Sequence, residues 1–366
     1  IICEHVMNDL NKGKIFKRKT GARGMSADQI LRAAIIMILF SFTYEELAFH
    51  ISDSRSLRRF CRIGISDKGF KKSALNSNIK AISPETWDMI NRDLLGYAKD
   101  EGIEKGREAR IDCTVVESNI HQPSDSMQLW DCVRVLIRLI KKGVDGFGAE
   151  IIFTDYQRRA KRRMVGIQYG KNKKQIKKQY KDLLKVTRKV LGYAEKAVLV
   201  LEALPSSNVH VFSLIMEIKH YIDLTEKVID QTERRVFKGE KVPASEKILS
   251  IFEEHTDIIV KDRRETFFGH KICLTGGASN LILDCTILDG NPADSTLTID
   301  MLDRQNEIYG RYPLKVALDG GFASKDNLAQ AKDKGIKDVC FSKKRGLQEE
   351  DMCRSEYVYK RLRRFR

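Results

Sequence analysis

The chain has 366 residues, 42% of them hydrophobic, which is enough to bury more than one core. The 66 lysines and arginines exceed the 50 acidic residues by 16, and this excess favours a polyanionic partner, nucleic acid first, over a merely solvated basic surface. The eight cysteines show neither a CxxC pair nor zinc-ligand spacing, and the longest apolar stretch, residues 30–42, is too short and too charged to cross a bilayer.

The first hundred residues predict a helical region with well-formed caps. Residues 26–29 (SADQ) and 43–46 (TYEE) both place a glutamine or glutamate three positions after a hydroxyl side chain, the pattern of a capping box. We therefore expect helices over about 27–41 and 44–51. A third, basic helix within 55–63 makes the region either a helix-turn-helix that contacts DNA or a basic bundle without groove specificity. Its candidate DNA contacts are Arg55, Arg58, Arg59 and Arg62.

Residues 110–120 (RIDCTVVESNI) predict a strand with two different faces. Ile111 and Cys113 alternate with Asp112 and Thr114, the period of a strand. Asp112 lies centrally in this strand, which makes it a candidate functional acid. The remaining β pattern begins only near residue 265, so this strand is separated in sequence from its expected neighbours.

The intervening residues, 126–260, show no β pattern and keep two long heptad series. Because residues 205–208 (PSSN) lie between the series, we predict two long helices folded back as an antiparallel hairpin. The core positions of the first helix are Ile176, Tyr180, Leu183, Thr187, Val190, Ala194, Ala197, Leu201 and Leu204. Those of the second are Val211, Ile215, Ile218, Ile222, Thr225, Ile229, Thr232 and Val236.

Two basic stretches precede the first of these helices. Residues 156–164 (YQRRAKRRM) and 169–181 (YGKNKKQIKKQYK) concentrate cations with tyrosines among them. They form either a contact surface for nucleic-acid phosphates or a solvated helix face. The candidate DNA contacts in the first stretch are Arg158, Arg159, Lys161, Arg162 and Arg163.

From about residue 265 onward, strands and helices alternate. We expect strands at 267–277, 281–290, 314–319 and 338–343, with helices over about 294–309 and 324–334. With the strand at 110–120 in front, the element order is β-β-β-α-β-α-β. This order predicts an α/β fold with a ribonuclease H-like mixed sheet, which carries a long α-helical hairpin insertion and an all-α N-terminal domain.

In that topology two distant aspartates come together. The fourth strand lies parallel to the first, so Asp319 at its carboxyl end is expected beside Asp112, and Gly320 and Gly321 would let the backbone turn away sharply. Two unpaired carboxylates raise each other's pKa unless a cation lies between them, and their oxygens suit Mg²⁺ or Mn²⁺. Two such ions about 3.5–4 Å apart support in-line displacement at phosphorus. We therefore predict Asp112 and Asp319 as catalytic metal ligands for phosphoryl transfer.

The blocks around these acids resemble those of DDE-type transposases of bacterial insertion sequences, which have a ribonuclease H-like catalytic domain. Residues 110–131 (RIDCTVVESNIHQPSDSMQLWD) are similar to the first-aspartate block of that family, and residues 318–324 (LDGGFAS) to the second. Residues 341–352 (FSKKRGLQEEDM) are similar to the stretch before the third acid. The helical start, residues 26–60, is similar more loosely, so the resemblance covers nearly the whole chain.

The resemblance implies DNA transposition. Hydrolysis at the ends of the element exposes 3′ hydroxyls, which attack target double-stranded DNA in a synaptic complex of at least two subunits. Asp112 and Asp319 would be the first two ligands of two Mg²⁺ or Mn²⁺ ions. Further candidate DNA contacts are Lys271, Lys343, Lys344, Arg345 and Arg366.

The third acid of the family has no counterpart at the end of this chain. Arg366 matches an arginine that precedes the third ligand, a glutamate, by four residues. The late acids Glu349, Glu350 and Glu356 stand where the family has no ligand. The chain also begins without methionine, which indicates a fragment. Because the third acid is missing, we expect this fragment to be weak or inactive as a nuclease.

We divide the chain into a helical N-terminal domain (1–100), a catalytic domain (107–125 and 265–366) and a helical, coiled-coil-like insertion (126–264). Two alternatives stay open: a DNA-binding transposase remnant without catalysis, and a nuclease of the same fold without strand transfer. We expect a bacterial, cytoplasmic, nucleoid-associated protein that acts as a homodimer on DNA and has no membrane partner.

Overall fold

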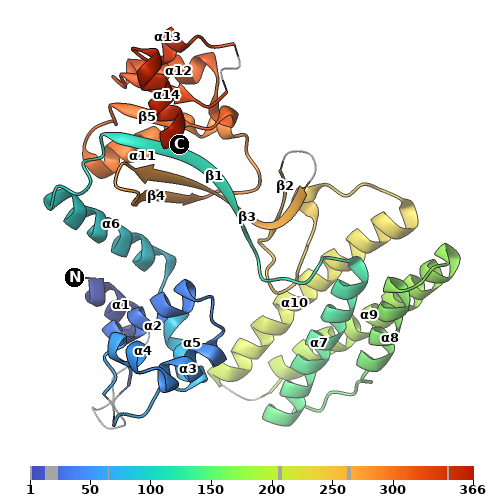
Figure 1. Cartoon of the computed structure of the whole chain (residues 1–366). Helices are drawn as coiled ribbons and strands as arrows, with labels where there is room; N and C mark the ends of the chain where they lie inside the picture. Colours follow the sequence, from blue (N-terminus) through green and yellow to red (C-terminus); the bar gives the residue numbers. More distant parts are fainter. Residues whose placement is uncertain (1, 13–23, 65, 205–207, 262–264, 344–345) are drawn as a thin grey trace. The chain divides into compact units, whose positions relative to one another are not determined.

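A computed structural model describes residues 2–12, 24–64, 66–204, 208–261, 265–343 and 346–366 (Figure 1). The chain divides into two compact units. The first unit comprises Ile1–Ile111, Thr275–Asp284 and Ser295–Arg366, and the second comprises Asp112–Leu274 and Cys285–Asp294. Three predicted features, the hairpin turn at 205–207 and the DNA contacts Lys344 and Arg345, lie outside the described residues.

Helices dominate both units. Those of the first unit are α1 (Ile2–Asn11), α2 (Ala27–Leu39), α3 (Tyr44–Asp53), α4 (Arg55–Phe60), α5 (Lys72–Ile79), α6 (Pro84–Asp100), α11 (Thr298–Tyr309), α12 (Lys325–Asp333), α13 (Glu349–Met352) and α14 (Glu356–Phe365). Those of the second are α7 (Asp125–Phe147), α8 (Gln157–Gln168), α9 (Lys173–Glu202) and α10 (Val209–Glu233). The strands are β1 (Glu108–Glu117), β2 (Asp257–Lys261), β3 (Glu265–Gly277), β4 (Ile282–Ile287), β5 (Lys315–Leu318) and β6 (Asp338–Phe341).

The strands form a mixed six-stranded sheet in the order β2-β3-β1-β5-β6, with β4 paired to β3. β5 runs parallel to both β1 and β6. Val316, Ala317 and Leu318 of β5 are fully buried, as are all four residues of β6, which is typical of parallel strands covered on both faces. In the first unit, α12 and α14 pack against β6, and α14 also packs against β5.

The strands and helices predicted after residue 265 are confirmed, but the wholly helical assignment of 126–264 is wrong. Residues Asp257–Lys261 form β2, which pairs antiparallel with β3. The pairing runs from Asp257 opposite Gly269 to Lys261 opposite Glu265. The sequence of β2, DIIVK, is only five residues long. A run of that length is too short to show a period, so its β-branched residues form a strand only because β3 provides the hydrogen-bonding partner.

The N-terminal helices surround their own core, and both predicted capping boxes are confirmed. The Ser26 hydroxyl accepts from the Gln29 amide while the Gln29 side chain accepts from the Ser26 amide, and Thr43 and Glu46 do the same for α3. The basic helix α4 is shorter than predicted because Arg62 has a φ of 53°, outside the helical region. None of the described helices alone is long and apolar enough to cross a membrane. Taken together, α2 and α3 meet both criteria, but the chain bends by 110° between them.

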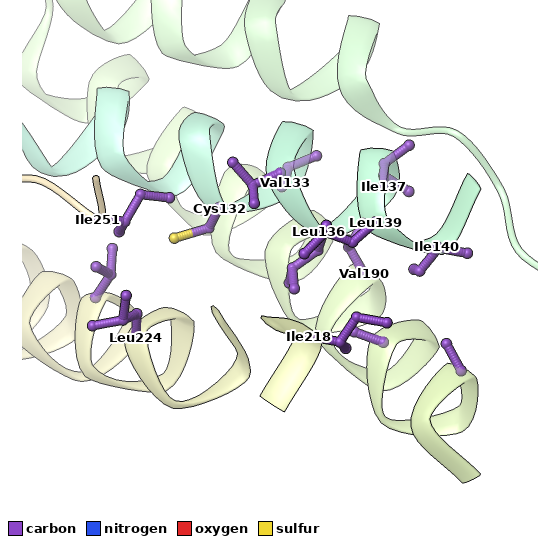
Figure 2. Close-up of a cluster of buried hydrophobic side chains, with 14 of the residues drawn as sticks. Cys132, Val133, Leu136, Ile137, Leu139, Ile140, Val190, Ile218, Leu224 and Ile251 are labelled. Carbon is purple, nitrogen blue, oxygen red and sulfur yellow. The ribbon is translucent and has the colours of Figure 1, made fainter. Parts of the chain in front are cut away.

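The core of the second unit confirms both heptad series. Leu183, Val190 and Leu201 of α9 are buried, as are Ile218 and Ile229 of α10. Figure 2 shows side chains of α7, among them Leu136, facing residues of α9 and α10. α7 is buried over more of its circumference than a single stripe because it packs against α8, α9 and α10 at once.

Candidate active site

Asp319 lies where the buried strand β5 ends. The chain passes directly from β5 into a short 3₁₀-helix, Gly320–Phe322, for which Asp319 is the N-terminal cap residue. The helix carries the chain away from the sheet, so the carboxylate is 37% exposed although Leu318 before it is fully buried. An acid therefore lies at the carboxyl end of the strand, the edge of the sheet where α/β proteins bind ligands.

Gly320 is required for space and not for a left-handed backbone. Neither Gly320 nor Gly321 is among the glycines with positive φ, so the turn that follows Asp319 does not depend on a left-handed backbone. A Cβ atom on Gly320 would instead lie 2.7 Å from the Cβ of Lys343. The glycine thus lets the segment that follows β6 pass close to the end of β5.

Two side chains contact the same oxygen of Asp319. The Ser342 hydroxyl donates to Oδ1 over 2.8 Å, and the Nη1 of Arg366 lies 2.7 Å from it. Burial alone would raise the pKa of Asp319, but the Ser342 hydroxyl, the Gly320 and Gly321 amides and the Arg366 charge outweigh it and lower that pKa. Asp319 is therefore ionised at neutral pH.

Ser342 was not predicted as part of the site, although the sequence carries a signal for it. Leu318 pairs with Phe341 in the parallel register of β5 and β6. The residues that follow this pair are Asp319 and Ser342, and parallel strands end at the same edge of a sheet. The side chain after the last parallel strand was thus the place to look for a partner of Asp319.

The register of β1 shows that Asp112, like Asp319, directly follows a residue of a parallel strand pair. β1 and β5 pair in parallel, from Glu108 opposite Lys315 to Ile111 opposite Leu318. The next residue in sequence is Asp112 after β1's Ile111 and Asp319 after β5's Leu318. Asp112 is exposed, and its Oδ1 accepts a hydrogen bond of 2.9 Å from the Cys113 amide. The predicted alternation is confirmed, since Ile111 is buried while the side chain of Asp112 is not.

Carboxylate oxygens at these two positions match the ligand type that Mg²⁺ and Mn²⁺ prefer. Within the described ranges, no three His, Cys, Asp or Glu side chains come together as a metal-binding group. Mg²⁺ commonly takes one or two carboxylates from the protein and its remaining ligands from water and substrate phosphate, so each of these acids fits it by ligand type.

Glu356 does not lie at the carboxyl end of β5. It occupies the first turn of α14, where its carboxylate pairs with the Lys360 Nζ at 2.5 Å. Arg366, which contacts Asp319, directly follows the other end of this ten-residue helix. A rise of 1.5 Å per residue puts Glu356 about 15 Å from Arg366 along the helix axis.

The arginines of α4 divide into two kinds. Arg55, Arg58 and Arg59, together with Arg62 just after the helix, line an open cavity of about 1020 Å³. Arg58, however, donates to the Gly64 and Asp67 carbonyls over 2.5 and 2.7 Å, and the Nη1 of Arg62 lies 3.2 Å from Asp28. Arg58 and Arg62 therefore hold the turn after α4, which leaves Arg55 and Arg59 as the better candidates for DNA contact.

The arginines of α8 divide in the same way. Arg159 and Arg163 pair with Asp182 of α9 at 2.5 and 2.6 Å, and these two partners, Arg159 first, lower the pKa of Asp182 to about 2 despite its burial. Arg158, Lys161 and Arg162 are exposed. The sequence placed all five in one group because charge alone does not show which cations have a partner.

Lys271 and Lys343 differ in their surroundings. The Lys271 side chain is only 11% exposed, and its Nζ donates to the Pro292 carbonyl and pairs with Asp294, each over 2.6 Å. In this structure its ammonium is thus directed to protein groups. Lys343 is exposed beside Gly320, at the same edge as Asp319.

Comparison of the chain with protein-family models, with curated proteins and with solved structures finds no match in any of the three.

Proposed function

We propose that the chain is a DDE-type DNA transposase with a ribonuclease H-like catalytic domain. The observation that carries the proposal is the parallel register of β1 and β5, whose last pair, Ile111 and Leu318, is followed on both strands by an aspartate. The strand order supports it, because β4, β3 and β1 are neighbours and β5 and β6 follow on the other side of β1. A ribonuclease H-like sheet requires this arrangement of its first five strands.

In this proposal the carboxylates of Asp112 and Asp319, each the residue that follows the last β1–β5 pair, would hold Mg²⁺ or Mn²⁺. Such ions, when bound, would activate an attacking oxygen and stabilise charge on the leaving oxygen. Asp319 needs no prior deprotonation to receive a cation, since its lowered pKa keeps it ionised. The exposed cations would bind DNA through its phosphates.

The reaction has two steps in this proposal. Water attacks a phosphorus at the end of the element, the bond to the 3′ oxygen breaks, and that oxygen leaves as a hydroxyl after taking up a proton. The freed 3′ hydroxyl then attacks a phosphorus of target DNA, forms the new phosphodiester bond and displaces a 3′ oxygen of the target strand.

Arg366 favours a second candidate function, a DNA-binding protein without catalysis. Its guanidinium lies 2.7 Å from an Asp319 oxygen that a metal ion would need, and the described residues bring no third acid to the group. A protein of this kind would bind DNA through the same exposed cations and would not depend on Mg²⁺.

Calorimetric titration with Mn²⁺ distinguishes the two candidates. The experiment compares the unmodified chain with Asp112→Ala, with Asp319→Ala and with Asp326→Ala, an exposed acid in the first turn of α12 that serves as the control. We expect the first two substitutions each to abolish binding and the control to leave it unchanged. Binding that survives either of the first two substitutions would overturn the catalytic proposal, and the second candidate would replace it.

A further inference from the structure

The segment from the start of α8 to the second turn of α9 is the most strongly charged part of the chain. Residues 156–181 contain eleven lysines and arginines, five in α8 and six from residue 171 onward, and no acid. Runs of like charge repel and usually stay unfolded or carry a ligand. This segment is folded into two packed helices of the second unit, which lie side by side (Figure 1).

Helical periodicity sorts the five cations of α8 onto two faces. Arg159 and Arg163, four residues apart, point to α9 and share Asp182. Arg158, Lys161 and Arg162 follow the spacing of the opposite face and are exposed, and in the described part of the chain they form no ion pair. The fold thus uses two arginines to attach α8 and leaves three exposed cations, of which Lys161 also has its Nζ 5.9 Å from the centre of the Trp130 ring.

Close packing of α8 on α9 keeps this outer face rigid. Ala160, Met164 and Ile167 of α8 are buried. At Gly166 the helices approach so closely that a Cβ atom would lie 2.0 Å from the Gln179 Oε1. The exposed cations therefore stand on a helix whose apolar side is already covered.

The positive surface continues into α9. Five lysines between residues 173 and 181 are exposed, and the turn between the helices presents Lys171 and Tyr169, which is 80% exposed. We name the exposed cations of this segment the basic elbow: Arg158, Lys161, Arg162, Lys171, Lys173, Lys174, Lys177, Lys178 and Lys181. Two acids flank the segment: Asp182 pairs with Arg159 and Arg163, and Asp155 pairs with Lys141 at 2.6 Å.

We propose that the basic elbow binds the phosphodiester backbone of double-stranded DNA. The inference rests on the proposed function in that DNA is the partner, and it assigns a DNA-binding role to the helical insertion. Rigid helices that display a dense run of cations suit phosphate contact, which depends on charge and not on base sequence.

Two other polyanions fit the basic elbow less well. A helix that lies on a membrane must bury an apolar face in lipid, whereas the apolar face of α8 is buried in the protein core. Single-stranded nucleic acid is bound by several aromatic side chains on which bases stack, and the segment exposes one strongly accessible aromatic, Tyr169. Duplex DNA, bound by its backbone, needs neither feature.

The test removes three cations from the outer face of α8 in the full chain. The variant Arg158→Ala/Lys161→Ala/Arg162→Ala is compared with a control of equal charge loss, Lys196→Ala/Lys227→Ala/Lys241→Ala, whose lysines are exposed elsewhere in the second unit. Fluorescence anisotropy measures the affinity of each for a short duplex of arbitrary sequence as a function of KCl. Circular dichroism melting shows whether both variants fold like the unmodified chain.

Each phosphate contact contributes about 0.9 to the slope of log affinity against log salt, so the elbow variant should lose about two to three from that slope. Its dissociation constant should rise at least about tenfold near physiological salt, with an unchanged slope for the control. An elbow variant that binds duplex DNA like the control overturns the inference and leaves the proposed function standing. If the unmodified chain binds no duplex DNA, both fail.

The same variants are also tested on single-stranded RNA and on vesicles that contain phosphatidylserine. We expect the elbow substitutions to weaken binding to duplex DNA more than binding to either of these. A larger loss for RNA or for vesicles would identify a different polyanion as the partner of the basic elbow and overturn the inference.

Discussion

Asp182 and Asp319 both lie against arginine, yet their surroundings differ in kind. Both oxygens of Asp182 accept hydrogen bonds from Arg159 or Arg163, and the side chain is 21% exposed. Asp319 is more exposed, and Ser342 and Arg366 both contact its Oδ1. A carboxylate whose oxygens are both paired stabilises the packing of two helices, whereas one at a strand end with a single arginine can exchange that arginine for another cation.

The largest expected difference is in stability. Asp182→Ala leaves Arg159 and Arg163 without their shared acid and should lower the free energy of unfolding by about 1–2 kcal/mol, after allowance for partial exposure. Urea denaturation followed by circular dichroism measures this change. Asp319→Ala should cost less, because its partners stay solvated. Equal losses from the two substitutions would break the comparison.

Protonation of Asp182 should make the free energy of unfolding depend on pH. The pKa of Asp182 is lowered to about 2, so its pair with the arginines contributes fully above the unfolded value of about 3.9 and is lost as pH falls toward 2. Asp182→Asn should remove this part of the acid destabilisation. Denaturation at pH 5 and at pH 3, roughly on either side of the unfolded pKa, measures it. Parallel curves for the variant and the unmodified chain would contradict the expectation.

Removing Arg366 should make Asp319 a better cation ligand. Arg366→Gln takes away a positive charge that lies 2.7 Å from the carboxylate, so the pKa of Asp319 should rise and Mn²⁺ should bind about fivefold more tightly. Arg364→Gln, an exposed arginine near the same end of α14, is the matched control. Calorimetry that finds the two variants alike would show that Arg366 does not compete with metal.

The smallest effect is expected at Ser342. Ser342→Ala removes the hydrogen bond to Asp319 and should raise the pKa of that carboxyl, with a stability cost of about 1 kcal/mol. Ser342→Thr keeps the hydroxyl and should behave like the unmodified chain. Titration of the Asp319 carboxyl carbon by NMR measures the pKa. A pKa that does not change in Ser342→Ala would mean that the backbone amides and Arg366 alone keep Asp319 ionised.

The helix starts and the helical cores could be predicted because their causes are local. Ser26 and Thr43 cap helices through hydrogen bonds to residues three positions away, and the heptad series of α9 and α10 buries the residues that its period selects. The strand period around Asp112 is local in the same sense. Each of these features requires only the residues of one element.

Pairing between elements had to come from the tertiary structure. β2 becomes a strand through β3, and Gly320 is required because Lys343 passes beside it. None of these partners lies within one turn or one strand period of the residue that it affects. Sequence periodicity therefore contains no signal for them.

From its residues alone, this protein is recognisable as a basic α/β chain with two acids at strand positions and a long helical insertion. Which cations hold the fold and which face solvent depends on contacts such as those of Arg159 with Asp182 and of Arg366 with Asp319. Charge is a property of each side chain, and it can be counted in the sequence. Neutralisation is a property of pairs, and pairs form only when the chain has folded.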